Sequence, residues 1–468
     1  PKSLPNAPRL DAIHLDGRVL LFTLATCVFA GLLFGLVPAL RGAGSDVNST
    51  LKENVRGSSA VHQRARSVLV VVEMALALVL LVGAGLMLRT LISLWRVDPG
   101  FDPRHVISTG VGLPQPSNAP ALPSDASAAM IRRMHQQIAS IPGVEAASLS
   151  WGATPMWGDD EVQFWFAGEP KPATDSEMRW GLDYVVEPGY FRAMGIQPLR
   201  GRQFSDRDDE RAPLIAVVDE DFARTFFPQG DPLGARINTE DYGQGIEIVG
   251  VVRHVNQWGL GANPAKYPLQ AQIYFPILQL PAARRAEAAK GAGLIVRTSL
   301  APADLDNAVR RALLPLNSQA VVFGTVPMDE IVGRTLATRR FAMLLLGIFA
   351  GLALLLASIG IYGVISYAVG QRTREIGIRM ALGAQRGDVL RIVLGQGAKL
   401  TAIGVAVGVI AALALSRLLQ TVLWGVRPTD PLTYAAVSAL LAAVALLACF
   451  VPVRRAVRVD PTVALRYE

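Results

Sequence analysis

The sequence is poor in cysteine and in charged residues. Only two cysteines occur among 468 residues, Cys27 and Cys449, and both lie inside apolar runs without a histidine or acidic neighbour. They offer no disulfide framework and no zinc site, and we interpret both as small apolar packing residues. Charged residues make up 18% of the chain, whereas a soluble globular protein carries about a quarter. The composition therefore favours a membrane protein.

Motifs that carry catalysis are also missing. None of the six lysines stands in a GxxxxGK[ST] phosphate-binding loop, and neither an HExxH nor a GxSxG motif occurs. His105, His135 and His254 are far apart in the sequence, and the acidic clusters 159–161 and 206–210 lack the spacing of a calcium-binding EF-hand. We interpret both clusters as solvated loops. The sequence predicts no catalytic residue, no cofactor and no metal site, so we expect a protein that is not itself an enzyme.

The charges are distributed unevenly. Residues 97–338 contain 21 basic and 28 acidic side chains, and the rest of the chain contains 24 basic and 10 acidic ones. The net charge of +7 therefore comes from the flanks, where arginines border apolar runs. This pattern is the positive-inside signature of a membrane protein rather than a nucleic-acid-binding patch.

Five apolar runs are long enough to cross a bilayer, which needs about 20 residues. They are Val19–Leu40, Val68–Leu88, Phe341–Val369, Leu400–Leu423 and Tyr434–Val453. Arginines fill the link between the first and second runs, the link between the third and fourth, and the segment after the fifth. These three basic segments are predicted to be cytoplasmic, which places 97–338 outside the cytoplasm. Small residues such as Gly404 and Gly408 predict close packing between the helices.

Matched spacings suggest an internal repeat. Asp16 precedes Pro38 by 22 residues, as Asp430 precedes Pro452, and each proline is followed eight residues later by an aspartate. The alternative is that any two outside-to-inside spans share an edge proline and basic flanks. We infer that the first run ends an earlier copy of the module. The chain, which begins with Pro1 rather than methionine, would be a fragment or processed form comprising mainly the second half of a duplicated protein.

Between the second and third runs the pattern becomes soluble α/β. Short apolar runs predict strands at Leu214–Val218, Ile246–Val252, Ile273–Tyr274 and Leu294–Arg297. Helices are predicted at Ser127–Ser140, Asp219–Phe227 and Asp304–Leu314. The predicted fold is an α-helical membrane protein with about five transmembrane helices and an inserted α/β domain. Its parts would be residues 1–66 (the last helix of the preceding repeat and a linker), 67–96 (a helix), 97–338 (the outer domain) and 339–468 (three helices).

Several segments resemble a known family. VVEPGYFRAMGIQPLRGR at 185–202, AVVDEDFARTFFP at 216–228 and IVGVV at 248–252 are similar to the periplasmic core domain of MacB-type ABC transporter subunits. SIGIYG at 358–363 and REIGIRMALGA at 374–384 are similar to the FtsX-like permease domain. The inferred duplication and the absence of an ATPase motif together make the chain most similar to the acidobacterial duplicated orphan permeases (the ADOP family). The resemblance implies a bacterial inner-membrane protein with residues 97–338 in the periplasm.

The resemblance also implies a docking element for a partner ATPase. This coupling helix would comprise Arg374, Glu375, Ile376, Gly377, Ile378, Arg379, Met380, Ala381, Leu382, Gly383 and Ala384. Glu375 and Arg379 are four residues apart and share a helical face, as do Ile378 and Leu382. Spacing alone allows two interpretations, a helix in a partner's groove or a helix on the lipid surface. The resemblance favours docking.

Two functions compete at this level. The first is the permease or mechanotransmission subunit of an ABC export system, which borrows an ABC ATPase in trans and can engage a membrane-fusion adaptor. The second is an FtsX-like regulator of extracytoplasmic enzymes such as cell-wall hydrolases, without transport. Membrane lipid and either the preceding repeat or a second copy of the chain are the other expected partners; nucleic acid is not. An anchored extracytoplasmic enzyme is disfavoured by the missing catalytic motifs.

Overall fold

The structure is a computed structural model. It describes residues 17–18, 20–29, 32, 58–114, 123–152, 154–156, 160–262, 267–371, 386–419 and 423–456. The chain divides into two compact units, one formed by Arg96–Leu336 and the other by the segments before and after it.

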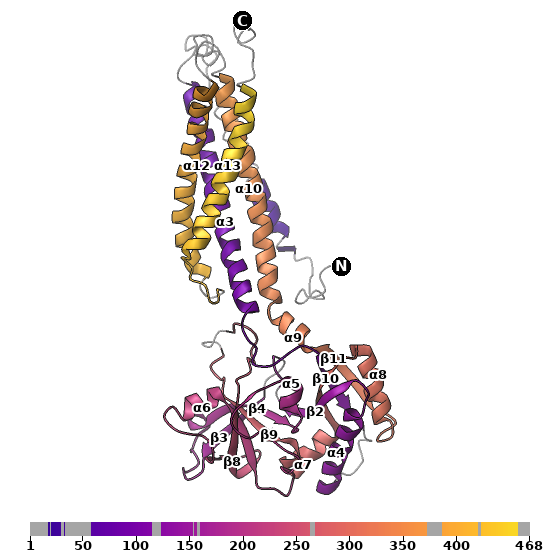
Figure 1. Cartoon of the computed structure of the whole chain (residues 1–468). Helices are drawn as coiled ribbons and strands as arrows, with labels where there is room; N and C mark the ends of the chain where they lie inside the picture. The colour runs from indigo at the N-terminus through magenta and orange to yellow at the C-terminus, as the bar shows by residue number, and fades with distance from the viewer. Residues whose placement is uncertain are drawn as a thin grey trace. The chain divides into compact units, whose positions relative to one another are not determined.

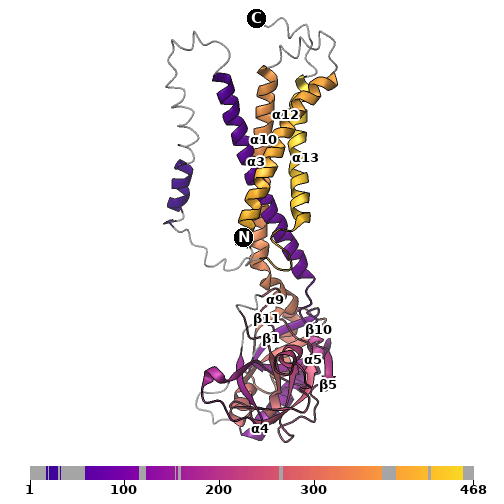
Figure 2. The ribbon, with the colours of Figure 1, turned by 90° about the vertical axis from the view of Figure 1, so that its left-hand side faces the viewer.

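The helical unit contains four long helices that run alongside one another (Figure 1, Figure 2). They are α3 (Ser58–Trp95), α10 (Ala337–Gln371), α12 (Arg386–Ser416) and α13 (Pro431–Ala456). Each contains a stretch that is long and apolar enough to cross a membrane, namely Ser67–Trp95, Ala337–Gly370, Leu394–Ser416 and Pro431–Phe450. These stretches confirm four of the five predicted spans. The first predicted span lies largely outside the described residues, which show only a shorter apolar helix, Leu20–Phe29.

Helix α3 packs against the other three helices. Glycines on its neighbours make this approach possible. A β-carbon on Gly404 of α12 would lie 2.8 Å from Cβ of Met74, and one on Gly408 would lie 2.9 Å from Cβ of Leu78. The prediction that Gly404 and Gly408 allow close helix packing is therefore confirmed. The helix faces that point away from the neighbouring helices are also apolar. Ile348 and Leu356 of α10, for example, are both 59% exposed. Apolar residues on all sides are typical of a helix surrounded by lipid.

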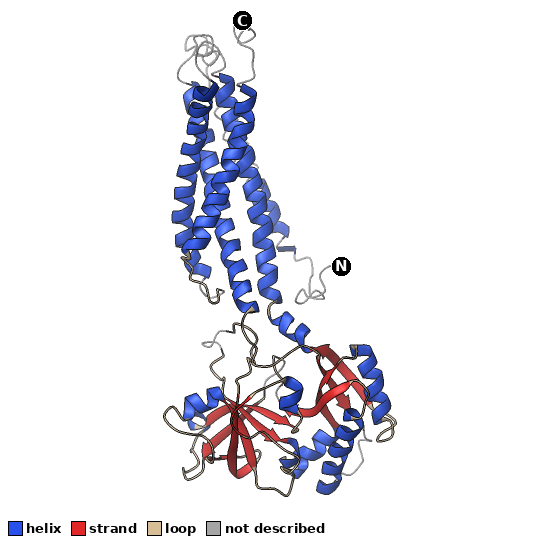
Figure 3. Ribbon diagram, in the orientation of Figure 1, coloured by secondary structure: helices blue, strands red, loops and turns tan. Residues whose placement is uncertain are grey.

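The unit Arg96–Leu336 is built on one sheet, and all strands in the described part of the chain belong to it (Figure 3). The strands are β1 (Val106–Gly112), β2 (Val144–Gly152), β3 (Glu161–Phe166), β4 (Arg179–Val186), β5 (Pro198–Gly201), β6 (Ile215–Asp219), β7 (Arg236–Thr239), β8 (Gly243–Val252), β9 (Gln272–Pro276), β10 (Gly291–Thr298) and β11 (Val321–Pro327). Their order is β11-β1-β10-β2-β4-β3-β7-β8-β6-β9, with β5 paired to β8.

The sheet closes on itself over part of its length. Strand β9 pairs in parallel with β4, with Ile273 opposite Asp183, and antiparallel with β6. The pairing β4-β3-β7-β8-β6-β9 thus returns to β4 and forms a six-stranded ring. The remaining strands, β11-β1-β10-β2, form an antiparallel extension joined to the ring where Ser150–Gly152 of β2 pairs with β4.

Helices cover this sheet. They are α4 (Ser124–Ala139), α5 (Tyr190–Met194), α6 (Glu220–Phe226), α7 (Ala282–Lys290), α8 (Pro302–Leu313) and α9 (Met328–Thr335), with the 3-10 turns η2 (Asp175–Glu177) and η3 (Ile277–Gln279). A third 3-10 turn, η4 (Arg417–Leu419), follows α12 in the helical unit. The predicted helices correspond to α4, α6 and α8, and the predicted strands to β6, β8, β9 and β10, so these predictions are confirmed.

Two apolar cores form on the sheet. One includes Ile131 and Met134 of α4 and Val309 of α8, and the other includes Tyr190 and Phe191 of α5. The first core holds α4 by one face, because Ile131, Met134 and Ile138 recur at helical spacing and are completely buried. The border of this buried face carries Arg132 and His135, which are partly buried and line a cavity.

Candidate functional site

The predicted coupling helix, Arg374–Ala384, lies outside the described residues. Helix α10 ends at Gln371 on one side of this segment and α12 begins at Arg386 on the other. The docking role therefore stays a prediction, and the site described below is a different one.

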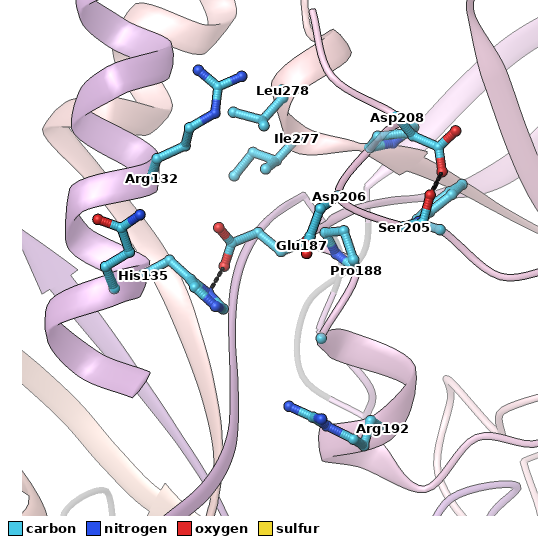
Figure 4. Close-up of a pocket in the computed structure, with 14 residues that line it drawn as sticks. Arg132, His135, Glu187, Pro188, Arg192, Ser205, Asp206, Asp208, Ile277 and Leu278 are labelled. Carbon is cyan, nitrogen blue, oxygen red and sulfur yellow. Dashed lines mark hydrogen bonds and ion pairs between the residues drawn. The ribbon is translucent and has the colours of Figure 1, made fainter. Parts of the chain in front are cut away.

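A polar cavity of about 720 Å³ lies within the unit Arg96–Leu336 (Figure 4). A volume of this order suits a small ligand. Its residues come from α4, from the segment between β4 and α5, from α5 itself, from the loop after β5, and from the junction of β9 with η3. The lining residues are Arg132, His135, Gln136, Glu187, Pro188, Gly189, Arg192, Phe204, Ser205, Asp206, Asp208, Pro276, Ile277 and Leu278.

Buried Glu187 and partly exposed His135 form the polar centre of this cavity. The side chain of Glu187 is 8% exposed, and its Oε2 lies 2.8 Å from Nδ1 of His135. The same oxygen accepts a 2.7 Å hydrogen bond from the backbone N–H of Leu149 in β2. The hydrogen bond to Glu187 raises the pKa of His135, against the opposing effect of burial. The pair thus joins α4 to two strands and favours the protonated imidazole.

The acidic loop 206–210 is engaged by arginines at the edge of the cavity. Asp208 is buried and accepts 2.7 and 2.8 Å hydrogen bonds from the guanidinium of Arg202. Its Oδ2 also accepts bonds from the N–H and hydroxyl of Ser205. Burial opposes ionisation of Asp208, but these donors outweigh it and lower its pKa. Glu210 pairs with Arg132 at 2.5 Å.

The interpretation of residues 206–210 as a simple solvated loop is therefore wrong for Asp208 and Glu210. The sequence of residues 206–210 does not indicate which basic side chains pair with its carboxylates. Arg132, for example, is 78 residues away from Glu210 and reaches it only in the folded chain. In the other acidic cluster, Asp160 and Glu161 are exposed as expected, and Asp159 lies outside the described residues.

Two charged residues that line the cavity, Arg192 and Asp206, are exposed. Within the described part of the chain, neither the guanidinium of Arg192 nor the carboxylate of Asp206 has a hydrogen bond or ion pair. The Nε2 atom of His135 likewise has no hydrogen bond to a described residue, since only Nδ1 contacts Glu187. The cavity thus offers two cationic donors and one anionic acceptor to a solute. No group of three or more His, Cys, Asp or Glu residues that could hold a metal ion occurs among the described residues.

A second buried charge pair has a structural explanation. Asp219 is completely buried at the end of β6, where it caps α6 by accepting from the N–H of Phe222 at 2.8 Å. It also accepts from the N–H of Gln272 at 2.9 Å and contacts Nδ1 of His254 at 2.5 Å. Burial opposes protonation of His254, but the bond to Asp219 outweighs it and raises the pKa of this histidine. These contacts connect the end of β6 to α6, to β9 and to the segment after β8. Neither Asp219 nor His254 lines the cavity described above.

Sequence reasoning missed the cavity. His135 was considered and set aside, because no motif joins it to Glu187, which lies 52 residues away. The one usable signal was that Glu187 and Arg192 both fall within the segment 185–202 that carries the family resemblance.

Comparison with known proteins identifies the two parts of the chain. Residues 69–316 match the MacB-like periplasmic core domain, and residues 347–461 match the FtsX-like permease C-terminal domain. The chain is 29% identical over 282 residues to the macrolide export ATP-binding/permease protein MacB of Chromobacterium violaceum, which covers 60% of this chain and 42% of that protein. It is 30% identical over 298 residues to the uncharacterized ABC transporter permease YvrN of Bacillus subtilis, covering 61% of this chain and 70% of that one.

A solved structure, the periplasmic region of MacB from Actinobacillus actinomycetemcomitans, aligns with 51% of this chain and 95% of its own, at 11% identity and a TM-score of 0.33. The assignment to a family depends instead on the two domain matches, the first of which spans more than half of the chain. The chain also spans less than half of the MacB relative's length. It belongs to the MacB-like periplasmic core domain family and is an ABC transporter permease of the MacB/FtsX type.

Proposed function

We propose that this chain is the membrane subunit of an ABC export system and converts the motion of a partner ATPase into motion of its outer domain. The observation that carries the proposal is the connectivity of α10. We call the unit Arg96–Leu336 the outer unit. Helix α10 begins directly after it and runs to residue 371, close to the predicted coupling helix. Its 35 residues correspond to a rod of about 50 Å, enough to cross a bilayer.

Helix α3 supplies the second lever. It ends at Trp95, one residue before the outer unit begins, and it packs along α10 through completely or largely buried residues such as Ala77, Ala357 and Ile361. The outer unit is therefore tied at both ends to two helices that pack on each other. A push on the segment Arg374–Ala384 would tilt α10, and α3 would follow because their contacts are close.

The remaining partners belong to the same proposal. The ATPase would be a separate ABC subunit, because the chain has no phosphate-binding loop. Residues 97–338 would lie in the periplasm of a bacterial inner membrane and could contact a membrane-fusion adaptor. The chain would work beside a preceding repeat of the same polypeptide, as in the ADOP family, or beside a second copy. The MacB relative is an ATP-binding/permease protein for macrolide export, which supports the coupling but does not assign a cargo here.

Affinity capture from native membranes tests the coupling. The wild-type chain should retain an ABC ATPase in gentle detergent, and Glu375→Lys and Gly383→Leu should each abolish this retention. Glu330→Lys, in the outer unit, is the matched control for the charge reversal and should retain the ATPase. Retention by all variants would refute the docking role, and capture of no ATPase by the wild type would refute the ATPase-coupled function. Co-purification of a cell-wall hydrolase in place of an adaptor would favour the regulatory alternative.

A further inference from the structure

We propose that the cavity centred on His135 and Glu187 binds a small zwitterion, a molecule with one carboxylate, one ammonium group and an apolar substituent. An apolar amino acid or a short apolar peptide has this chemistry. The cavity measures about 720 Å³, which is large enough for a dipeptide. This inference concerns ligand binding by the outer unit and does not depend on coupling to an ATPase.

The carboxylate end is assigned to His135 and Arg192. Protonated His135 uses Nδ1 for Glu187 and leaves Nε2–H as a donor to the cavity. Arg192 of α5 lines the same cavity and has no partner among the described residues. Arg132 is a weaker candidate, because Glu210 already occupies it at 2.5 Å. Two donors that carry positive charge and lack other acceptors form a suitable site for a carboxylate.

The ammonium end is assigned to Asp206. Of the three carboxylates that line the cavity, Glu187 is held by His135 and Leu149, and Asp208 is held by Arg202 and Ser205. Asp206 alone has no partner within the described residues. Asp206, Arg192 and His135 all line the same cavity, so the free acceptor and the free donors belong to one site. Figure 4 shows Asp206 and Arg192 on separate segments.

The apolar part of the cavity wall would favour a ligand that carries an apolar substituent. Phe204, Pro276, Ile277 and Leu278 line the cavity beside its charged groups. An apolar substituent against these side chains would remove apolar surface from water and contribute to affinity. Glu187 completes the site without contacting the ligand's charges, since its buried carboxylate positions the imidazole.

The test uses the full chain in detergent micelles at pH 6 and isothermal titration calorimetry with four probes. They are leucyl-leucine, its N-acetyl derivative, its C-terminal amide, and the derivative blocked at both ends. Leucyl-leucine should bind saturably, and each block should weaken binding by about tenfold, since each removes one charge-assisted contact. Equal binding of the doubly blocked peptide, or no saturable binding up to about 10 mM, would overturn the proposal.

Paired variants assign the two ends. Arg192→Gln should reduce the preference for a free carboxylate over the amide, because protonated His135 remains, and Asp206→Asn should remove the preference for a free ammonium over the acetyl group. Arg200→Gln and Asp231→Asn are matched controls, because these residues pair with each other outside the cavity at 3.4 Å. The controls should bind all four probes like the wild type. If Arg192→Gln weakened all four probes equally, or if Asp206→Asn left the ammonium preference intact, the assignment of charges would be wrong.

Discussion

Gly360 of α10 lies directly against the side chain of Glu73 of α3. A β-carbon at position 360 would collide with Oε2 of Glu73 and lie 3.3 Å from Cγ2 of Val70. This Oε2 atom is buried and has no hydrogen-bond partner among the described residues. Ionisable side chains inside membrane segments face the interior of the bundle, and Gly360 provides the space for this one.

The contact predicts that Gly360→Ala destabilises the helical unit. The added methyl group would displace the flexible carboxylate of Glu73 and press on Cγ2 of Val70, and overpacking of this limited kind costs about 1 kcal/mol. Thermal unfolding of the full chain in detergent, followed by intrinsic fluorescence, would measure the loss.

Gly363→Ala is the control for this change. Gly363 lies one turn further along the same helix, is exposed, and has no atom within 4 Å of a β-carbon position. The same methyl group there should leave the midpoint unchanged or raise it, because alanine favours helix more than glycine does. Equal losses at both positions would show that the contact between Gly360 and Glu73 does not matter.

A second prediction concerns Asp183 in β4. Its side chain accepts a hydrogen bond from the hydroxyl of Tyr242, while its Oδ1 is buried without a partner among the described residues. Burial raises the pKa of Asp183 to about 7, against an ordinary value of 3.8. Because the folded protein holds this proton more tightly than the unfolded chain, its stability falls as the pH rises from about 4 to 7.

Asp183→Asn should remove that dependence. The variant keeps an acceptor for Tyr242 but cannot ionise, so it should be more stable than the wild type at pH 8, by up to ~4 kcal/mol. The difference should shrink toward pH 5. Asp175→Asn, at an exposed position, controls for the loss of one negative charge. A stability difference that stays constant from pH 5 to pH 8 would contradict the assignment.

The membrane helices could be predicted from the sequence because a run of about 20 apolar residues needs no partner to be identified. Strand β6 was found because Ile215–Asp219 is buried at every position and its apolar run is continuous. Strand β1 was missed because Gly110 and Gly112 weaken any strand pattern. Gly110 of this strand is covered by a residue that is distant in the sequence. Phe323 of β11 lies opposite Gly110, and its ring fills the space beside this glycine.

The cavity was beyond prediction for a related reason. Its charges come from α4, from the segment around α5 and from the loop after β5; His135 of α4 is 52 residues from Glu187, and no local spacing indicates which of these charges become paired. Arg132 with Glu210 and Arg202 with Asp208 neutralise each other only after folding. Which charged side chains stay unpaired, and are therefore available to a ligand, depends on those pairings and not on composition.

A third prediction concerns the pair of His135 and Glu187. The hydrogen bond to Glu187 raises the pKa of His135 above its ordinary value of 6.5. The pair therefore makes its full contribution to the stability of the fold below about pH 6.5, and this contribution is lost as the pH rises through the folded-state pKa. His135→Gln should therefore destabilise the chain by roughly 1 kcal/mol at pH 6, a modest value because the imidazole is 34% exposed.

The same substitution should cost less at pH 9, where the wild-type imidazole is neutral. Chemical denaturation of both proteins at the two pH values measures the difference. In a Glu187→Gln background, which keeps an acceptor for the N–H of Leu149, the extra cost at pH 6 should disappear. A cost that is independent of pH in both backgrounds would show that the pair contributes by packing alone.

The last prediction separates two roles of Asp430. This residue precedes α13, where its Oδ2 accepts from the N–H of Thr433 at 2.9 Å and from its hydroxyl at 2.6 Å. The same carboxylate pairs with Arg89 of α3. Asp430→Ala removes both the helix cap and the ion pair, and should cost about 1–2 kcal/mol.

Asp430→Asn keeps a capping side chain and loses only the charge. Because Arg89 is 40% exposed, the ion pair should be worth less than about 1 kcal/mol, so the asparagine variant should retain most of the stability that alanine loses. Arg89→Gln should cost as much as Asp430→Asn, and the double variant should cost no more than either one, since both remove the same pair. Thermal unfolding of the four variants in detergent measures these losses of stability. If asparagine and alanine were equally harmful, the cap would contribute nothing, and Asp430 would act on α13 only through its charge.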